Sequence, residues 1–553
     1  MGNRTITILS FIAAVVVAFA ALITYQNTQR MIPQAIVEAP KPSSQGHNMQ
    51  PAPVKTSQTN NHDYAKNIVL PKPGQPVKTF TLTAVETNIR VKDGSSLAAW
   101  TYNGKVPGQE IRVQQGDFVQ VELRNNLKEP VTIHWHGYPL KSAMDGVPGL
   151  DQDAVRQGET FTYAFSADVA GTYWYHSHQE SSAQVDKGLY GALIVEPKNW
   201  TKPARDYTLI LDEWMESPEE GMAAMPGMDM SSDADASSPK GTEGMSGMNV
   251  PAAENSDLVM AEEEMMASMY NVYTVNGKSS GLIEPLEVQN GELVRLRFIN
   301  AGYRKHGIHL PGQEIRVVSS DGQDINDPQI IKDQIIMVSP GERYDVEFIV
   351  KADQNFVIDA HDENRYNEQL RIPVKVNESE QVLEESKNAS YPVFDLTGYG
   401  SGGNKLFTLE EKYDIDYKVD LNTDTGNNEL KYTINGKVFK ELPALKLKTG
   451  NLVKMTYINN SKVDHPMHLH GHFFQMLSKN GKPASGAVIT KDTLLIKPGE
   501  EYVVAFRADN PGSWVQHCHE LHHASAGMMQ AIEYTDFTSN YNPDPNKTFN
   551  KPE

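Results

Sequence analysis

The stretch TYNGK at residues 101–105 recurs as TVNGK at 274–278 and as TINGK at 433–437. Asn-Gly is a strong turn signal. Each copy is followed by a segment in which apolar and polar residues alternate: QQGDFVQVELRNN at 114–126, QNGELVRLRFINA at 289–301 and KTGNLVKMTYINN at 448–460. Because alternation with a period of two indicates a half-buried β-strand, the sequence predicts three copies of one β unit.

A second element recurs downstream, the Gly-Glu pairs at 158–159, 341–342 and 499–500, and each opens another alternating strand. Short strands, regular turns and no long amphipathic helix between them indicate β-sandwiches. We therefore predict an all-β chain with three tandem sandwich domains at residues 68–198, 203–376 and 400–537.

The second predicted domain is interrupted at residues 215–269, which hold 11 of the chain's 21 methionines. This stretch has no strand pattern, so we interpret it as an insertion. Its last part, residues 258–269, is compatible with a short helix.

The N-terminal segment is an export signal or an anchor. Residues 5–25 are uncharged and mostly apolar, and as a helix they are about long enough to span a bilayer. Ala18-Phe19-Ala20 fits a signal cleavage site, whereas the apolar run through Ala21, Leu22 and Ile23 favours an uncleaved membrane anchor. We predict a signal or anchor at 1–25 and a disordered tether at 26–67, which makes the rest of the chain extracytoplasmic, either membrane-anchored or secreted.

The net charge bears on the possible partners of the protein, and the cysteine content bears on disulfides and metal ligands. The chain has 70 acidic and 50 basic residues and a formal net charge of −20, which argues against a nucleic-acid partner. The one cysteine, Cys518, excludes an intramolecular disulfide. A free cysteine is commonly a small buried hydrophobe, but His517 and His519 flank this one and favour a role as a ligand.

Ten of the seventeen histidines fall into short groups in the first and third copies: His134, His136, His176, His178, His465, His468, His470, His517, His519 and His523. Residues two apart on a strand point to the same face, so each His-x-His pair offers two imidazoles to one side. Imidazole suits copper, and a nearby thiolate and thioether narrow the choice. Cys518, two histidines and a weakly bound methionine, Met528 or Met529, fit a trigonal copper site for single-electron transfer.

These motifs, in this order over residues 75–535, resemble those of the multicopper oxidases, the family of laccases, ascorbate oxidase and bacterial copper-efflux oxidases. The resemblance implies cupredoxin-like domains, four copper ions and the four-electron reduction of dioxygen to water. It assigns a type 1 copper to His465, Cys518 and His523, with Met528 as the axial ligand. It assigns the type 2 copper to His134 and His468, and the type 3 pair to His136, His176, His178, His470, His517 and His519.

The second copy lacks most of this ligand set. Asn300 of this copy aligns with Asn125 and Asn459 of the other two. Nine residues after Asn300 stands His309, but two residues further the second copy has Pro311 where the other copies have histidine. His361 has no cysteine beside it. We therefore expect a spacer domain in which His306, His309 and His361 have structural roles.

Dioxygen reduction consumes protons, so a carboxylate is expected near the cluster. Asp145, after the His-Trp-His-Gly motif, resembles the proton-relay aspartate of the family. Bacterial members often carry an acid just before the second type 1 histidine, but here that residue is His522 and the nearest acid is Glu520. Asp145 and Glu520 are the catalytic candidates, and the departure at His522 leaves the second half of the proton path open.

The reducing substrate must be inferred from the insertion. Thioethers are soft donors that favour Cu(I), and Met222, Met225, Met228 and Met230 are candidate Cu(I) ligands. Family members that oxidise copper typically carry their Met-rich segment in the third domain, so this placement differs. We expect a monomeric cuprous oxidase that detoxifies copper. A laccase acting on phenols and a non-enzymatic copper carrier are the alternatives, and a Met-rich linker is the plainer interpretation of the insertion.

Overall fold

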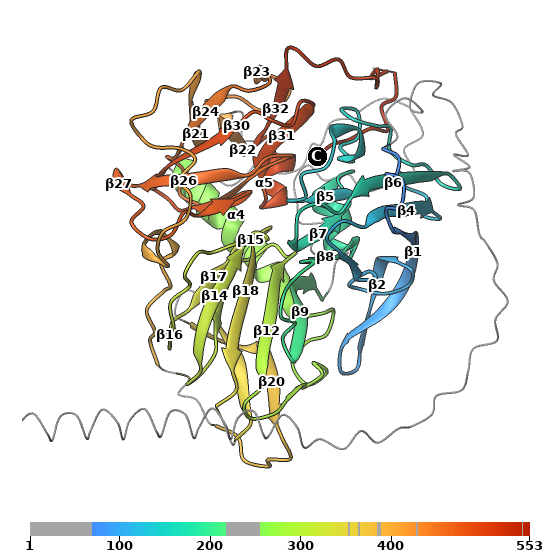
Figure 1. Ribbon diagram of the computed structural model, residues 1–553. Coiled ribbons are helices and arrows are strands. Elements are labelled where there is room, and N and C mark those ends of the chain that lie inside the picture. Colours follow the sequence, from blue (N-terminus) through green and yellow to red (C-terminus); the bar gives the residue numbers. More distant parts are fainter. Residues whose placement is uncertain are drawn as a thin grey trace, which may run out of the picture. The chain divides into compact units, whose positions relative to one another are not determined.

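Six β-sheets form three pairs that succeed one another along the chain. In Figure 1 the first pair is blue to teal, the second green to yellow and the third orange to red. The prediction of an all-β chain with three tandem cupredoxin-like sandwiches is confirmed. This computed structural model describes residues 69–216, 255–351, 354–362, 365–383, 387, 389–426, 430–544 and 546–553. The predicted signal or anchor, the tether and Met222, Met225, Met228 and Met230 lie outside these residues. Within them, no helix is long and apolar enough to span a membrane.

The first sandwich pairs a sheet in the order β2-β1-β4-β6 with a sheet in the order β3-β8-β7-β5. Its elements are β1 (Val77–Lys92), β2 (Ser95–Tyr102), β3 (Ile111–Gln114), β4 (Phe118–Asn125), β5 (His134–His136), η2 (Ser142–Met144), β6 (Thr160–Ser166), β7 (Gly171–His176), α2 (Ser181–Asp186) and β8 (Tyr190–Glu196).

The second sandwich consists of two sheets. One has the strand order β10-β9-β12-β18-β14-β15, with β16 paired to β14, and the other has the order β11-β20-β19-β13-β17. Its elements are β9 (Arg205–Met215), α4 (Asn255–Met269), β10 (Tyr270–Val275), β11 (Leu286–Val288), β12 (Leu293–Asn300), β13 (His306–His309), β14 (Glu314–Ser320), β15 (Gln323–Asp324), β16 (Ile331–Lys332), β17 (Ile336–Val338), β18 (Arg343–Ile349), β19 (Phe356–Asp362) and β20 (Arg365–Val376). Helix α4 covers the stretch for which the sequence allowed a short helix.

The third sandwich also consists of two sheets. One has the strand order β22-β21-β24-β30-β26-β27, with β28 paired to β26, and the other has the order β23-β32-β31-β25-β29. Its elements, after η3 (Leu396–Gly398), are β21 (Ile415–Asp424), β22 (Lys431–Ile434), β23 (Leu445–Leu447), β24 (Leu452–Asn459), β25 (His465–Leu469), β26 (Phe474–Lys479), β27 (Lys482–Pro483), β28 (Thr490–Lys491), β29 (Thr493–Ile496), β30 (Glu501–Arg507), β31 (Ser513–Cys518), α5 (Leu521–Ser525) and β32 (Met529–Tyr534).

The repeated Asn-Gly pairs form the same turn three times. Asn103, Asn276 and Asn435 have φ angles of 60°, 52° and 53°, and the glycine after each also has a positive φ. Two successive residues with positive φ fit a type I′ turn, in which Asn-Gly is preferred. Each asparagine side chain also bonds the backbone of a neighbouring strand, as in Thr83 N–H to Asn103 Oδ1 at 2.8 Å.

Strand register brings the histidine-bearing strands of each copy side by side. In the first sandwich β5 pairs with β7, so that His134 faces His176. In the third, β25 pairs with β31, so that His468 faces His517. In the second, β13 pairs with β19 and places His309 opposite Asp359. The three strand pairs are therefore equivalent, and only the second has a carboxylate at the position of an imidazole.

A buried asparagine lies at the end of the strand that precedes each of these histidine-bearing strands. Asn125, Asn300 and Asn459 end β4, β12 and β24 and are fully buried. The Asn459 amide donates to Val463 O and Ile496 O, both at 2.8 Å, and accepts from Ser461 N–H. Asn125 and Asn300 make the corresponding three bonds. The repeated asparagine thus fixes the loop that leads into the histidine-bearing strand.

Asn459→Ala would leave two buried carbonyls without these donors, and it should lower the free energy of unfolding by about 3 kcal/mol, measured by urea unfolding. Asn300→Ala should cost a similar amount, because its bonds are the same. Copper content should fall only for Asn459→Ala, because the loop after Asn300 leads to β13 of the second sandwich. Full stability of both variants would contradict this role.

Candidate metal centres

Eight buried imidazoles come together from the first and third sandwiches: His134, His136, His176, His178, His468, His470, His517 and His519. Their ring nitrogens form three groups that can each hold a metal ion, with the donor atoms of a group within 4.8 Å of one another: His134/His136/His468, His136/His176/His519 and His178/His470/His517. The His136 and His468 rings stack at 3.8 Å, and the His134 and His470 rings at 3.9 Å. Each of these stacks joins one ring from each sandwich.

Hydrogen bonds engage one nitrogen of most rings and leave the other for a metal. His134, His176 and His178 bond backbone oxygens through Nδ1, while their buried Nε2 atoms have no hydrogen-bond partner. His136 is reversed, with Nε2 bonded to Thr493 Oγ1 at 3.0 Å and Nδ1 without a partner. Buried nitrogens that lack partners are costly unless a metal binds them, so the residues fit a copper cluster.

Burial also favours the uncharged form of the rings in this cluster whose pKa is shifted. Burial lowers the pKa of several imidazoles, and neighbouring histidines add to the effect. The rings concerned are His136, His176, His178, His468, His470, His517 and His519. The pKa of His178 falls to about 3. Neutral imidazole is the form that binds metal.

Asp145 connects two of the groups. Its Oδ2 accepts from His470 Nδ1 at 2.7 Å, and its Oδ1 lies 3.2 Å from His134 Nδ1. The side chain is buried. Asp145 therefore fixes the tautomer of one histidine from each sandwich, His470 through its carboxylate and His134 through its backbone oxygen.

A second centre lies in the third sandwich, where His465, Cys518 and His523 are buried together. Cys518 Sγ is 3.7 Å from His465 Nδ1 and 3.6 Å from His523 Nδ1, and these two nitrogens are 3.2 Å apart. Met528 is fully buried in the same hydrophobic cluster as Cys518, whereas Met529 packs in a different one with Val147 and Val515. The surroundings therefore favour Met528 as the thioether of this site.

Glu520 sits beside this centre at the start of α5. Its carboxylate accepts from the backbone N–H groups of His522 and His523 and lies 3.0 Å from His522 Nδ1. Burial would raise the pKa of Glu520, but these histidines hold it well below its usual range. Its catalytic role stays a prediction.

The outer edge of His523 is covered by α4, the helix that ends the Met-rich insertion. Glu263 Oε1 lies 2.7 Å from His523 Nε2, and the Glu263 carboxylate also accepts from Tyr303 and Tyr432. The ring of Tyr432 stacks on that of His523 at 3.8 Å. Glu263 is 260 residues from His523 in sequence, and no motif in the sequence identified it.

The histidines of the second sandwich have carboxylate neighbours. His306 pairs with Glu213, and His309 Nδ1 is 3.3 Å from Asp359 Oδ1. His361 Nε2 is 3.2 Å from the same oxygen. These contacts agree with the structural roles expected from the sequence.

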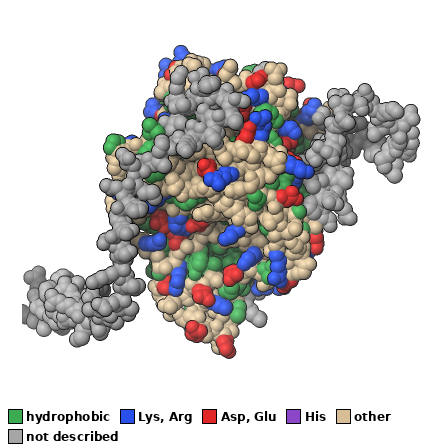
Figure 2. All heavy atoms as spheres, turned by 90° about the vertical axis from the view of Figure 1, so that its right-hand side faces the viewer, with side chains coloured by type: hydrophobic (Ala, Val, Ile, Leu, Met, Phe, Trp, Pro, Cys, Tyr) green, Lys and Arg blue, Asp and Glu red, His purple; other side chains and the backbone are tan. Residues whose placement is uncertain are grey.

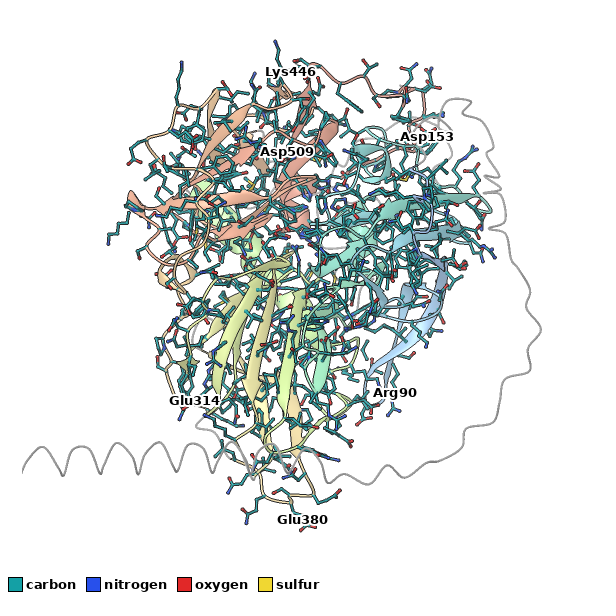
Figure 3. All side chains as sticks on the ribbon, in the orientation of Figure 1. Arg90, Asp153, Glu314, Glu380, Lys446 and Asp509 are labelled. Carbon is teal, nitrogen blue, oxygen red and sulfur yellow. The ribbon has the colours of Figure 1, made fainter. Side chains whose placement is uncertain are left out.

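The last residues of the chain also reach the cluster. His178 Nδ1 bonds the backbone oxygen of Pro552 at 2.9 Å. Asp153, labelled in Figure 3, helps to hold this segment, since it accepts from Tyr541, Lys547 and Asn550. Sequence motifs gave no sign of this contact.

One face of the molecule carries charged side chains of both signs. On the face shown in Figure 2, Lys and Arg side chains are interspersed with Asp and Glu.

Comparison with known proteins points to one family. Residues 83–200, 205–386 and 411–536 each match a family model described as multicopper oxidase. The chain is 29% identical over 493 residues to "Multicopper oxidase MmcO" of Mycobacterium tuberculosis, covering 84% of this chain and 88% of that protein. It is 26% identical to "Copper resistance protein A homolog" of Pseudomonas syringae pv. tomato, covering 84% and 94%. The crystal structure of a multi-copper oxidase from Pseudomonas thermotolerans matches with a TM-score of 0.61 at 27% identity, over 84% of this chain and 100% of that one.

Fold and site together define a copper-dependent oxidoreductase with dioxygen as the electron acceptor. The chain belongs to the multicopper oxidase family. Its cofactors are four copper ions, one of type 1, one of type 2 and two of type 3.

The pKa of His178 gives a test at acidic pH. Below pH 6.5, the usual pKa of histidine, the unfolded chain binds a proton at residue 178 that the folded apo-protein accepts only near pH 3. This residue should therefore cost about 1.4 kcal/mol of stability per pH unit as the pH falls through that window. His178→Gln should flatten the pH dependence of urea unfolding by that amount between pH 6 and 4, and an unchanged slope would contradict the buried, neutral ring.

Proposed function

We propose that His465, Cys518 and His523 would hold the type 1 copper, with Met528 as a weak fourth ligand. His134 and His468 hold the type 2 copper. The type 3 pair is held by two groups of three, His136/His176/His519 and His178/His470/His517. Support for these assignments comes from the grouping of the donor atoms and from the ring nitrogens without partners.

Bound copper would supply one-electron transfer at the centre that contains Cys518 and four-electron reduction of dioxygen to water at the cluster of eight histidines. The protein connects the two centres through β31, because Cys518 stands between His517 and His519 in sequence. Successive residues of a strand point to opposite faces, so the thiolate and the two imidazoles serve different centres. Asp145 holds His470 at Nδ1 and serves as the proton-handling carboxylate.

We propose Cu(I) as the reducing substrate, and the position of Glu263 carries this proposal. With Nδ1 turned to Cys518, the Nε2 of His523 is the outer end of the type 1 site, and it contacts Glu263. The Glu263 side chain is 24% exposed, so a donor in solution can reach it. Glu520 Oε2 also lies 2.8 Å from His523 Nε2, so two carboxylates meet at this nitrogen. An entry point with this much negative charge attracts a cation more than a neutral phenol.

Soft donors lie on the same helix. Met266 of α4 is buried, and Met265 and Met269 are half-buried. Thioethers and a carboxylate together suit delivery of Cu(I) to this edge. We propose that the enzyme works outside the cytoplasm, membrane-anchored or secreted, and detoxifies copper by converting Cu(I) to Cu(II). Oxidation of phenols, as by a laccase, is the alternative.

Cys518→Ser tests the type 1 assignment. A cysteine thiolate bound to Cu(II) gives intense visible absorption, so the copper-loaded wild type should be blue and the variant colourless. The variant should retain the three histidine-bound coppers, measured as copper per chain. A colourless wild type with four coppers would contradict the assignment.

Glu263→Gln tests the substrate. It keeps the hydrogen-bonding shape but removes the charge, so the KM for Cu(I) should rise about tenfold while oxidation of a small phenol changes little. Glu264→Gln, at an exposed position next to it on α4, is the matched control and should behave as wild type. Oxygen uptake measures both reactions.

A separate variant tests whether the methionines of the insertion at residues 215–269 take part in Cu(I) oxidation. Replacing Met222, Met225, Met228 and Met230 together by Ser removes soft donors while keeping the length of the chain. Cu(I) oxidation should weaken and phenol oxidation should stay. If this variant and Glu263→Gln both oxidise Cu(I) as the wild type does, the laccase function should replace the cuprous oxidase.

A further inference from the structure

We propose that Arg343, a residue of the second sandwich, is a positioning residue for the trinuclear copper site. It fixes Asp492, and Asp492 with Thr493 orients His136 and His468. The inference rests on the proposed ligand assignment, and it gives the middle sandwich, expected from the sequence to be a spacer, a direct part in the metal site.

Arg343 and Asp492 form a buried bidentate pair across two sandwiches. Arg343 begins β18, and Asp492 lies between β28 and β29 of the third sandwich. Nη1 donates to Asp492 Oδ1 at 2.7 Å and Nη2 to Oδ2 at 2.6 Å. Both side chains are fully buried. A guanidinium matches a carboxylate in this fork geometry, which lysine cannot reproduce.

Asp492 and Thr493 in turn contact the stacked pair of histidines. Asp492 Oδ1 lies 3.3 Å from His468 Nδ1 and 3.4 Å from His136 Nε2. Thr493 Oγ1 lies 3.1 Å and 3.0 Å from the same two nitrogens and donates to Asp492 Oδ1. The Asp492 backbone oxygen is 3.0 Å from His468 Nδ1. These contacts leave His468 Nε2 and His136 Nδ1, which have no hydrogen-bond partners, to face the metal.

Asp321, also from the second sandwich, holds the same segment from the other side. Its Oδ1 accepts from the Arg343 backbone N–H at 3.0 Å, and its Oδ2 accepts from Thr493 N–H at 3.0 Å. Lys491 Nζ pairs with Asp321 Oδ2 at 3.1 Å. The start of β29 is therefore tied to the second sandwich at Asp492 and on both sides of it.

Two glycines show how closely the second sandwich approaches the cluster. A Cβ on Gly137, directly after His136, would lie 2.2 Å from Arg343 Nη2 and 2.4 Å from Asp492 Oδ2. A Cβ on Gly341 would lie 2.8 Å from His519 Cγ and 3.1 Å from His136 Cε1. The pair thus fills the space beside Gly137, and the loop before β18 packs on two cluster rings.

A purely structural ion pair is the competing explanation, and the chain contains a matched example of one. Arg297 on β12 is also buried, and it bonds Asp206, Asp345 and, in the first sandwich, Thr172 Oγ1. It joins two sandwiches as Arg343 does. The difference lies in the partner, because Asp492, the partner of Arg343, itself contacts His136 and His468. Loss of either arginine should destabilise the fold, whereas only loss of Arg343 should change the copper site.

The experiment compares Arg343→Lys and Arg343→Gln with Arg297→Gln in the copper-loaded protein. The readouts are copper per chain, the EPR hyperfine splitting of the type 2 copper, the blue absorption and thermal unfolding. Both Arg343 variants should bind type 2 copper at least tenfold more weakly, with an altered splitting and an unchanged blue band. Arg297→Gln should lose stability but keep wild-type copper content and EPR.

Wild-type type 2 copper in the Arg343 variants, or the same copper loss in Arg297→Gln, would overturn the proposal. If the Arg343 variants do not fold, Thr493→Val removes one contact to each histidine while keeping the side-chain shape. It should alter the type 2 splitting, and an unchanged splitting would then overturn the proposal. Retention of the type 2 signal in His468→Gln would instead contradict the ligand assignment itself.

Discussion

The structure depends on burying eight imidazoles at one junction while holding each ring in a fixed orientation. Burial alone would make such a cluster costly, since most rings have a nitrogen without a hydrogen-bond partner. Bound copper would offset this cost, and the surrounding acceptors decide which nitrogen faces it. Asp145, Asp492, Thr493 and several backbone oxygens are those acceptors. The strand pairs β5/β7 and β25/β31 are what bring the rings to one place.

Much of the fold could be predicted from the sequence because it depends on patterns within short segments. The Asn-Gly turns and the period-two strands are properties of short segments, and their threefold repetition implies three sandwiches. The histidine pairs were predictable for the same reason, since strand alternation puts both members of His-x-His on one face. The sequence also marked Asn125, Asn300 and Asn459 as equivalent, but their bonds to loop carbonyls became clear only in the structure.

The rest could not be predicted because it depends on contacts between distant segments. Glu263 meets His523 across 260 residues, and Arg343 meets Asp492 across 149. A glutamate on a short helix and an arginine at the start of a strand are common, and neither has a spacing that links it to a ligand. The expectation that the second sandwich is a spacer followed from its missing ligands. It overlooked support supplied by residues that are not ligands, such as Arg343 and Asp321.

The central claim is that these histidines and Cys518 hold all four coppers of the enzyme. Anomalous diffraction at the copper edge on crystals of the copper-loaded protein tests it most directly. We expect one peak among His465, Cys518 and His523, and three peaks enclosed by the eight histidines of the junction, with His134 and His468 sharing one of them. A peak bound by His309, Asp359 and His361, or fewer than three peaks at the junction of a fully loaded protein, would contradict it.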